Sequence, residues 1–123
     1  MTLAYWCVFV AAVMPYIFTL VAKSGGRYNN HAPRDFLEKQ EGIQRRANWT
    51  QLNSFEAFPA FAAAVIIAHL QEVSQGTINF FAVSFIIFRI AYAYAYLTDK
   101  AQLRSIVWGL GFICVISLFI SAA

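Results

Sequence analysis

Apolar residues gather in four long runs along the chain, and short polar segments separate the runs. A hydrocarbon core about 30 Å thick takes roughly 20 helical residues to cross. Each run reaches or approaches that length, so the pattern predicts four membrane-spanning helices. The expected spans cover residues 3–22, 49–70, 77–97 and 104–122.

The first run has no charged side chain and contains Pro15. It differs from a secretory signal peptide because no basic residue precedes it and no small-residue cleavage site follows it. We therefore expect a retained helix with a bend near residues 11–15, where neighbouring helices can satisfy the backbone group that proline frees.

The basic residues of the polar segments predict a topology. Six of the nine Lys and Arg residues lie between residues 23 and 48, more follow at 98–104, and the turn at 71–76 has none. Because cytoplasmic loops collect Lys and Arg, both basic segments are expected in the cytoplasm and both termini outside. Residues 35–46 carry helix-forming side chains and are expected to lead into the second span as a helix.

Composition supports one small membrane domain. Of 123 residues, 60% are hydrophobic and 12% are charged, against roughly 25% charged in soluble domains. We expect residues 1–123 to form a single all-α, four-helix integral membrane bundle with no soluble module. The net charge of +3 follows from the topology, so no nucleic-acid partner is expected.

The second span carries polar side chains into the membrane. Its uninterrupted apolar run covers only residues 57–70, so the span must include residues before it. At about 100° per residue, Arg46, Trp49, Asn53 and Glu56 fall within an arc of about 80°. A carboxylate at membrane depth is costly and is usually paired, solvated in a cavity or functional. The alternative is that these groups only join helices by hydrogen bonds.

The third span carries an arginine with two phenols. Arg89, Tyr92 and Tyr96 lie within about 60° of one another, while Tyr94 points elsewhere. Such a wall of donors suits a carboxylate or an anionic sulfur. The alternative is that Arg89 neutralises Glu56, and we expect some pairing of the two under either interpretation.

The remaining reactive residue types indicate no separate chemistry. His69 has no second ligand at a zinc-like spacing and is interpreted as an interfacial residue. Cys7 and Cys114 form no metal or redox motif and are interpreted as small buried apolar groups. Gly109 and Gly111 permit close helix packing. We find no phosphate loop, dinucleotide fingerprint or Ser/His/Asp triad, and we expect no metal.

The polar residues occur in an order that resembles the MAPEG family, the membrane-associated proteins in eicosanoid and glutathione metabolism. The resemblance covers essentially the whole chain. It implies a left-handed four-helix bundle that assembles as a homotrimer, with glutathione between neighbouring subunits near the cytoplasmic face. The motifs are Arg46-Ala47 followed by Gln51, Asn53, Glu56 and Pro59, then Arg89-x-x-Tyr92-x-x-x-Tyr96, and then Leu103-Arg104-Ser105.

The resemblance assigns a role to each matching position. Arg104 takes the place of the arginine that stabilises the glutathione thiolate. A thiol with a pKa of about 8.5 is mostly protonated at pH 7, and a neighbouring guanidinium lowers that pKa to create the nucleophile. The second-helix residues that would hold the tripeptide are Gln51, Asn53 and Glu56, and those expected to face it from the adjacent subunit are Arg89, Tyr92 and Tyr96.

One position departs from the family pattern. The eicosanoid branch has an arginine four residues before the motif asparagine, where this chain has Trp49. Either Arg46 takes over that contact with glutathione, or the contact is weaker here. Lys23 or Arg27 could supply a further contact with a glutathione carboxylate.

The leading hypothesis is a membrane-bound glutathione transferase. Glutathione is the co-substrate, and its sulfur attacks a lipophilic electrophile that arrives from the bilayer. A related activity is glutathione-dependent reduction of lipid hydroperoxides. Short loops and no retention signal at the C-terminal end favour a bacterial inner-membrane protein.

Two other functional classes are alternatives to a transferase. The same fold could serve as a non-catalytic scaffold or accessory subunit, because fold resemblance does not establish activity. A small transporter is disfavoured, since the four spans have neither repeats nor paired broken helices.

Overall fold

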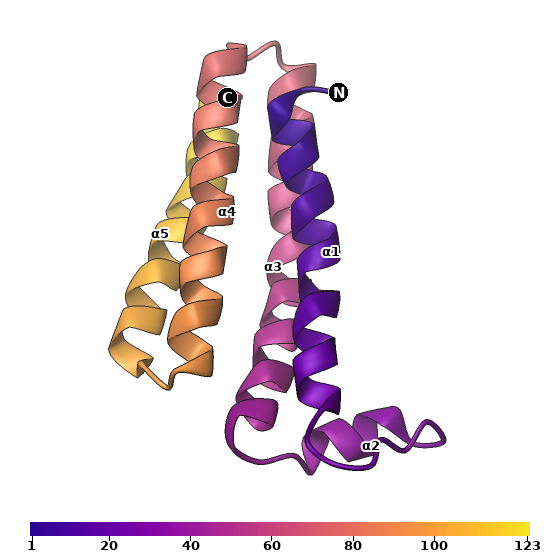
Figure 1. The fold of residues 1–123 in the computed structure, drawn as a ribbon. Helices are drawn as coiled ribbons and strands as arrows, with labels where there is room; N and C mark the ends of the chain where they lie inside the picture. Colours follow the sequence, from indigo (N-terminus) through magenta and orange to yellow (C-terminus); the bar gives the residue numbers. More distant parts are fainter.

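The computed structural model describes residues 1–123 as five helices without strands (Figure 1). Four helices are long and apolar enough to cross a membrane, which confirms the all-α prediction of four spans. The short helix α2 lies in the first basic segment. The helices are α1 (Leu3–Lys23), α2 (Pro33–Glu38), α3 (Gly42–Leu70), α4 (Gln75–Leu97) and α5 (Ala101–Ser121).

The long helices form two antiparallel pairs. α1 packs along α3 and α4 packs along α5, and the 71–76 turn joins the pairs at the end where both termini lie (Figure 1). The stacked rings of Phe61 and Phe85, with centroids 3.9 Å apart, connect the pairs through the core. Small buried residues such as Ala64 and Ala82 allow the helices to approach closely.

The apolar core fills only part of the length of the bundle. Its buried members come from the start of α1, the end of α3, the start of α4 and the end of α5, so they gather near the 71–76 turn. The opposite half, toward the basic segments, contains the buried polar side chains of Asn48, Gln51 and Arg89. This division leaves the polar half of the bundle available for a site.

His69 ties the N-terminus to the end of α3. Its Nε2 lies 3.0 Å from Thr2 Oγ1, its Nδ1 lies 2.7 Å from the carbonyl oxygen of Val65, and its ring stacks on Tyr5 at 4.0 Å. The amide of Ala4 donates to Asn79 Oδ1 at 3.2 Å. The role of His69 is therefore to join helices at this end of the bundle.

The segment that leads into the second span differs from the prediction. α3 begins at Gly42, and residues 39–41 separate it from α2, so the prediction of one helix over residues 35–46 is wrong at that point. Gly42 has φ of +61°, a left-handed conformation that glycine adopts without the usual steric cost. Across this joint, a Cβ on Gly25 would meet the side chains of Gln40 and Gln44, which would have to shift. The joint therefore depends on glycine at position 42.

α1 continues as one helix through the buried Pro15, and the Thr19 hydroxyl oxygen lies 3.1 Å from the Pro15 carbonyl oxygen. The bend near residues 11–15 stays a prediction.

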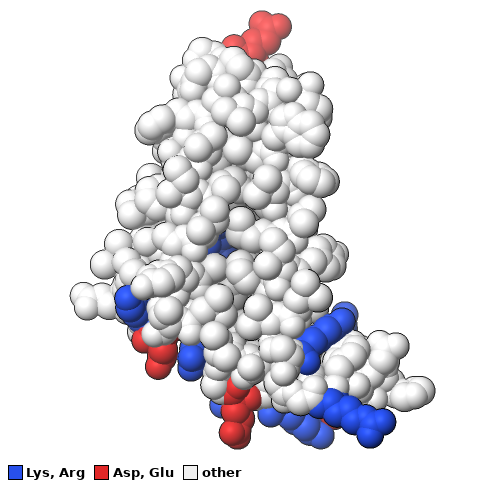
Figure 2. Space-filling model, in the orientation of Figure 1, with Lys and Arg blue, Asp and Glu red and all other residues white.

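Charged residues gather at one end of the molecule. Figure 2 shows most Lys, Arg, Asp and Glu atoms at the end with the two basic segments, and one blue patch recessed in the otherwise white body. The two basic segments thus lie on the same side, as the predicted topology requires.

Candidate functional site

A polar cleft of about 480 Å³ opens between α3, α4 and α5 toward the basic end of the bundle. It contains five of the residues predicted to form the site, and all five come from one chain. The expectation that Arg89, Tyr92 and Tyr96 face glutathione from the adjacent subunit stays a prediction. The cleft is lined by Trp49, Leu52, Asn53, Glu56, Tyr92, Tyr96 and Arg104.

Two arginines lie against the two tyrosines of the cleft. Arg104 Cζ is 4.5 Å from the centroid of the Tyr96 ring, and Arg89 Cζ is 4.3 Å from that of Tyr92. The tyrosine rings meet edge to face at 5.5 Å. A guanidinium is attracted to the face of an aromatic ring, so these stacks hold the arginines in place.

The side chain of Arg104 makes no hydrogen bond within the chain, so the five N–H donors of its guanidinium remain available to a ligand. It is half-buried and stands in the first turn of α5, where the helix dipole adds positive potential. An anion in the cleft is favoured next to this side chain.

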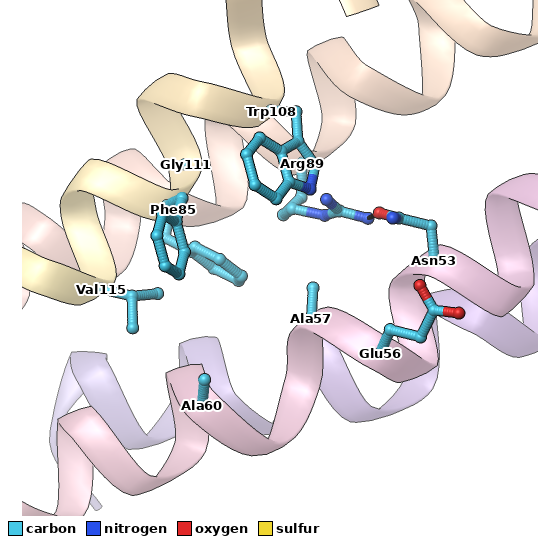
Figure 3. A pocket seen from close by; sticks show the side chains of 10 residues that line it. Asn53, Glu56, Ala57, Ala60, Phe85, Arg89, Trp108, Gly111 and Val115 are labelled. Carbon is cyan, nitrogen blue, oxygen red and sulfur yellow. Dashed lines mark hydrogen bonds between the residues drawn. The ribbon is translucent and has the colours of Figure 1, made fainter. Parts of the chain in front are cut away.

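Arg89 is buried, and its Nη2 donates to Asn53 Oδ1 at 2.7 Å (Figure 3). The expected ion pair between Arg89 and Glu56 is not formed, because the asparagine one turn earlier on α3 takes that contact. The only ion pair in the chain joins Lys39 to Asp35 on the surface. The exposed carboxylate of Glu56 therefore lines the cleft without a cationic partner.

Arg46, which could take over the contact of the arginine absent at Trp49, does not line the cleft. Its Nε donates to the carbonyl oxygen of Leu97, 3.2 Å away, at the end of α4. Trp49 itself lines the cleft, with its ring 6.2 Å from that of Tyr96. Arg46 thus connects α3 to α4 outside the cleft.

Gln51 lies on a different face of α3 from Asn53. Its Nε2 donates to Asn48 Oδ1 at 2.8 Å, and its Oε1 accepts from the Thr19 hydroxyl. It lines a second hollow of about 300 Å³, which we call the Arg34 hollow. The hollow is lined by Arg34, Leu37, Glu38, Asn48, Gln51, Leu52 and Phe55.

The two further cations considered for carboxylate binding are not in the cleft. Lys23 ends α1 with its Nζ 4.5 Å from the centroid of the Tyr28 ring, and Arg27 lies exposed in the following loop. No group of three or more His, Cys, Asp or Glu residues converges on a point that could hold a metal ion.

A smaller cavity of about 170 Å³, which we call the inner cavity, adjoins the cleft and was missed by the sequence analysis (Figure 3). Asn53 and Glu56 line both spaces. One signal was present: Trp108 follows Arg104 by four residues and so shares its face of α5. The inner cavity is lined by Asn53, Glu56, Ala57, Ala60, Phe85, Arg89, Trp108, Gly111, Phe112 and Val115.

Comparison with known proteins gives one match. The family model described as the MAPEG family matches residues 3–123. No curated protein and no solved structure matches the chain.

Proposed function

The chain belongs to the MAPEG family of multi-pass membrane proteins, and from this premise we propose that it is a glutathione transferase that conjugates glutathione to lipophilic electrophiles. The observation that carries the proposal is the cleft in which the donors of Arg104 and the carboxylate of Glu56 both lack a partner in the chain. Groups of opposite charge held apart in one cleft suit a zwitterionic ligand.

Glutathione has chemistry that matches the cleft. It carries one amino group, two carboxylates and one thiol. The Glu56 carboxylate is placed to bind the ammonium group, and the phenols of Tyr92 and Tyr96 can donate to peptide or carboxylate oxygens. The cleft volume of about 480 Å³ falls within the usual range for small-molecule sites, about 300–1,000 Å³.

The reaction depends on Arg104. Its guanidinium favours the thiolate over the thiol, and the proton leaves to solvent. The sulfur lone pair then forms a bond to the electrophilic carbon while the leaving group departs with its electron pair. With a lipid hydroperoxide as acceptor, two glutathione molecules would be oxidised to the disulfide as the hydroperoxide is reduced to alcohol and water.

We further propose a homotrimer in which each Arg34 hollow faces the cleft of a neighbour. Leu52 lines both spaces, so α3 carries the cleft on one side and the Arg34 hollow on the other. In a closed ring this arrangement brings Gln51 and Arg34 to the glutathione of the adjacent subunit. The neighbour would thereby supply the basic contact that Trp49 does not.

The proposed location follows from charge. The basic end of the bundle would face the cytoplasm, from which glutathione enters the cleft, and the lipophilic acceptor would enter from the bilayer. Short loops favour a bacterial inner membrane.

The test is glutathione binding and turnover by the purified protein in detergent or nanodiscs. Calorimetry should detect saturable binding, and a chlorodinitroarene should be converted to its glutathione conjugate. Glu56→Gln should weaken glutathione binding at least tenfold, because it removes the partner of the ammonium group. Glu72→Gln, at the opposite end of the bundle, should bind like the parent. No binding by the parent protein would refute the proposal.

A non-catalytic scaffold is the second candidate. It is favoured by the polar groups that already have partners within the chain: Arg89 with Asn53, and Arg46 with Leu97. A scaffold predicts that glutathione gives no protection against thermal unfolding, whereas a glutathione-binding enzyme is stabilised by its ligand in proportion to RT ln(1 + [L]/Kd).

A further inference from the structure

The α1 helix exposes an apolar stripe that ends in a cation. Members of the stripe alternate at spacings of four and three residues, which places them on one face of the helix. All its apolar members are exposed, so no other helix of the chain covers this face. The stripe consists of Phe9, Val13, Tyr16 and Leu20, and Lys23 follows as the last residue of α1.

The segment after α1 carries positive charge with little compensation. Residues 23–34 contain three Lys or Arg residues and His31, and they contain no Asp or Glu. The first acid that follows, Asp35, is already paired with Lys39 at 2.9 Å. Figure 2 shows Lys and Arg side chains projecting from this part of the molecule. The surface formed by this segment therefore attracts anions.

Aromatic and apolar contacts hold this basic segment against the bundle. Lys23 Nζ lies 4.5 Å from the centroid of the Tyr28 ring, and Tyr28 meets Phe36 edge to face at 5.3 Å. Leu37 on α2 packs in a buried cluster with Ala22 on α1. α2 runs crosswise to the long helices at the basic end (Figure 1). The segment thus has a fixed position, at the level where the apolar stripe of α1 ends.

A phospholipid presents the same order of chemistry as this surface. Its acyl chains would lie against Tyr16 and Leu20, and its phosphate would lie at the hydrocarbon boundary next to Lys23, whose long side chain reaches that level. The exposed guanidinium of Arg27 can bind phosphate oxygens in a bidentate manner. Two cations favour a lipid with net negative charge, and such lipids gather in the cytoplasmic leaflet.

We propose that the end of α1 and the segment after it form a binding site for an anionic phospholipid of the cytoplasmic leaflet. The phosphate lies between Lys23 and Arg27, and an acyl chain lies along the stripe. Neither cation lines the cleft, so the inference does not depend on glutathione as the co-substrate. A helix of a second copy on the stripe would bring no anion to the two cations, so charge favours the lipid.

The first test measures lipid binding to the whole chain in detergent by native mass spectrometry. The probes are dioctanoyl phosphatidylglycerol and dioctanoyl phosphatidylcholine, which have the same acyl chains and differ in net charge. We expect phosphatidylglycerol to bind about tenfold more tightly at low salt, and the preference to shrink as the salt concentration rises. Equal affinity for the two lipids would overturn the proposal.

The second test locates the charge. Lys23→Gln/Arg27→Gln should abolish the preference for phosphatidylglycerol. The matched control, Lys39→Gln/Lys100→Gln, removes the same charge from the same end of the protein, at cations that already contact other side chains, and should keep the preference. Lys23→Arg/Arg27→Lys should also keep it, which separates charge from folding. An equal loss in both glutamine pairs would overturn a local site.

The third test concerns the apolar stripe. Leu20→Asn should weaken the binding of both lipids severalfold, because both use the same acyl chains. Leu70→Asn is the matched control, since Leu70 is 73% exposed against 71% for Leu20 and lies at the opposite end of the bundle. Unchanged lipid affinity in Leu20→Asn would overturn the role of the stripe. If that variant instead changed the number of chains per particle, a second copy would be the occupant.

A glutathione titration separates the lipid site from the proposed transferase. If Lys23→Gln/Arg27→Gln loses glutathione affinity but keeps its preference for phosphatidylglycerol, the two cations serve the cleft and the lipid site is overturned. If the parent protein binds no glutathione but prefers phosphatidylglycerol as described, the transferase proposal fails and the lipid site stands.

Discussion

Removal of the Arg104 charge gives the most direct test of thiolate formation in the cleft. Arg104→Leu keeps an apolar side chain next to Tyr96, whose ring the guanidinium now covers at 4.5 Å. No side-chain hydrogen bond within the chain is lost, because the guanidinium of Arg104 makes none. The variant should therefore assemble like the parent and differ in its effect on bound glutathione.

The expected fall in the pKa of the bound glutathione thiol follows from Coulomb attraction between the thiolate and the Arg104 guanidinium. A thiolate about 4 Å from the guanidinium gains about 4 kcal/mol at an effective dielectric constant of about 20. Arg104 is only half-buried, so solvent and salt reduce this to about 2 kcal/mol. At about 1.4 kcal/mol per unit, the pKa of the bound thiol would fall from about 8.5 to about 7.

The sign of the pH dependence follows from the lowered thiol pKa. The thiolate is present above its pKa and is lost as the pH falls through it, so in the parent it persists to about pH 7. In Arg104→Leu the thiolate would form only near pH 8.5, which lowers its population at pH 7 from about one half to about 3%. The rate of conjugation at pH 7 should fall about 15-fold, and the difference should vanish above about pH 9.5.

The assay is the ultraviolet absorbance of the thiolate together with kcat/KM for an activated aryl halide, each measured against pH. The control is Lys100→Met, which removes a positive charge from the same end of the protein. Lys100 donates to the Tyr94 hydroxyl at 3.0 Å outside the cleft. Parallel pH profiles for the parent and Arg104→Leu would refute the reasoning, as would an equal shift in Lys100→Met.

Three further changes test the framework around the site. Asn53→Leu leaves the buried Arg89 without its hydrogen-bond acceptor and should lower the free energy of unfolding by about 2–3 kcal/mol. The measurement is a denaturant titration in detergent, and an unchanged midpoint would show that the hydrogen bond contributes little. Gly25→Ala places a Cβ against Gln40 Oε1, so faster cleavage between α1 and α2 is expected in limited proteolysis, and parental cleavage would contradict the crowding. Thr2→Val removes the side-chain acceptor at the start of α1 and should lower the free energy of unfolding by about 1 kcal/mol. Amide hydrogen exchange in the first turn of α1 should become faster, and exchange at the parental rate would contradict the prediction.

Sequence reasoning predicted the fold because membrane insertion depends on local properties. A run of apolar residues must be helical and about 20 residues long whatever its neighbours are, since its backbone groups find no partners in lipid. The prediction of one continuous helix was wrong at residues 39–41, which separate α2 from α3. The segment consists of good helix formers, but Gly42, directly after the break, has a left-handed backbone conformation. Helix propensity does not reveal that conformation.

The candidate site was only partly predictable. Helical spacing placed Tyr92 with Tyr96, and motif order placed Asn53 and Glu56 beside them. Spacing could not decide which of the two α3 residues contacts Arg89, because both lie on the arc facing α4. The choice of Asn53 depends on how α3 and α4 are set against each other along their axes.

By itself, the sequence determined four membrane helices, one end rich in positive charge, and the residues that carry polar chemistry into the span. Only the tertiary structure decided how those residues are grouped: Asn53 and Glu56 share one cleft with Arg104, while Gln51 lies on another face of α3. It also decided that an aromatic cavity lies beside the cleft. The physical reason is that hydrophobicity is a property of each residue, whereas a cavity and its polar contacts depend on the relative positions of helices that are distant in the chain.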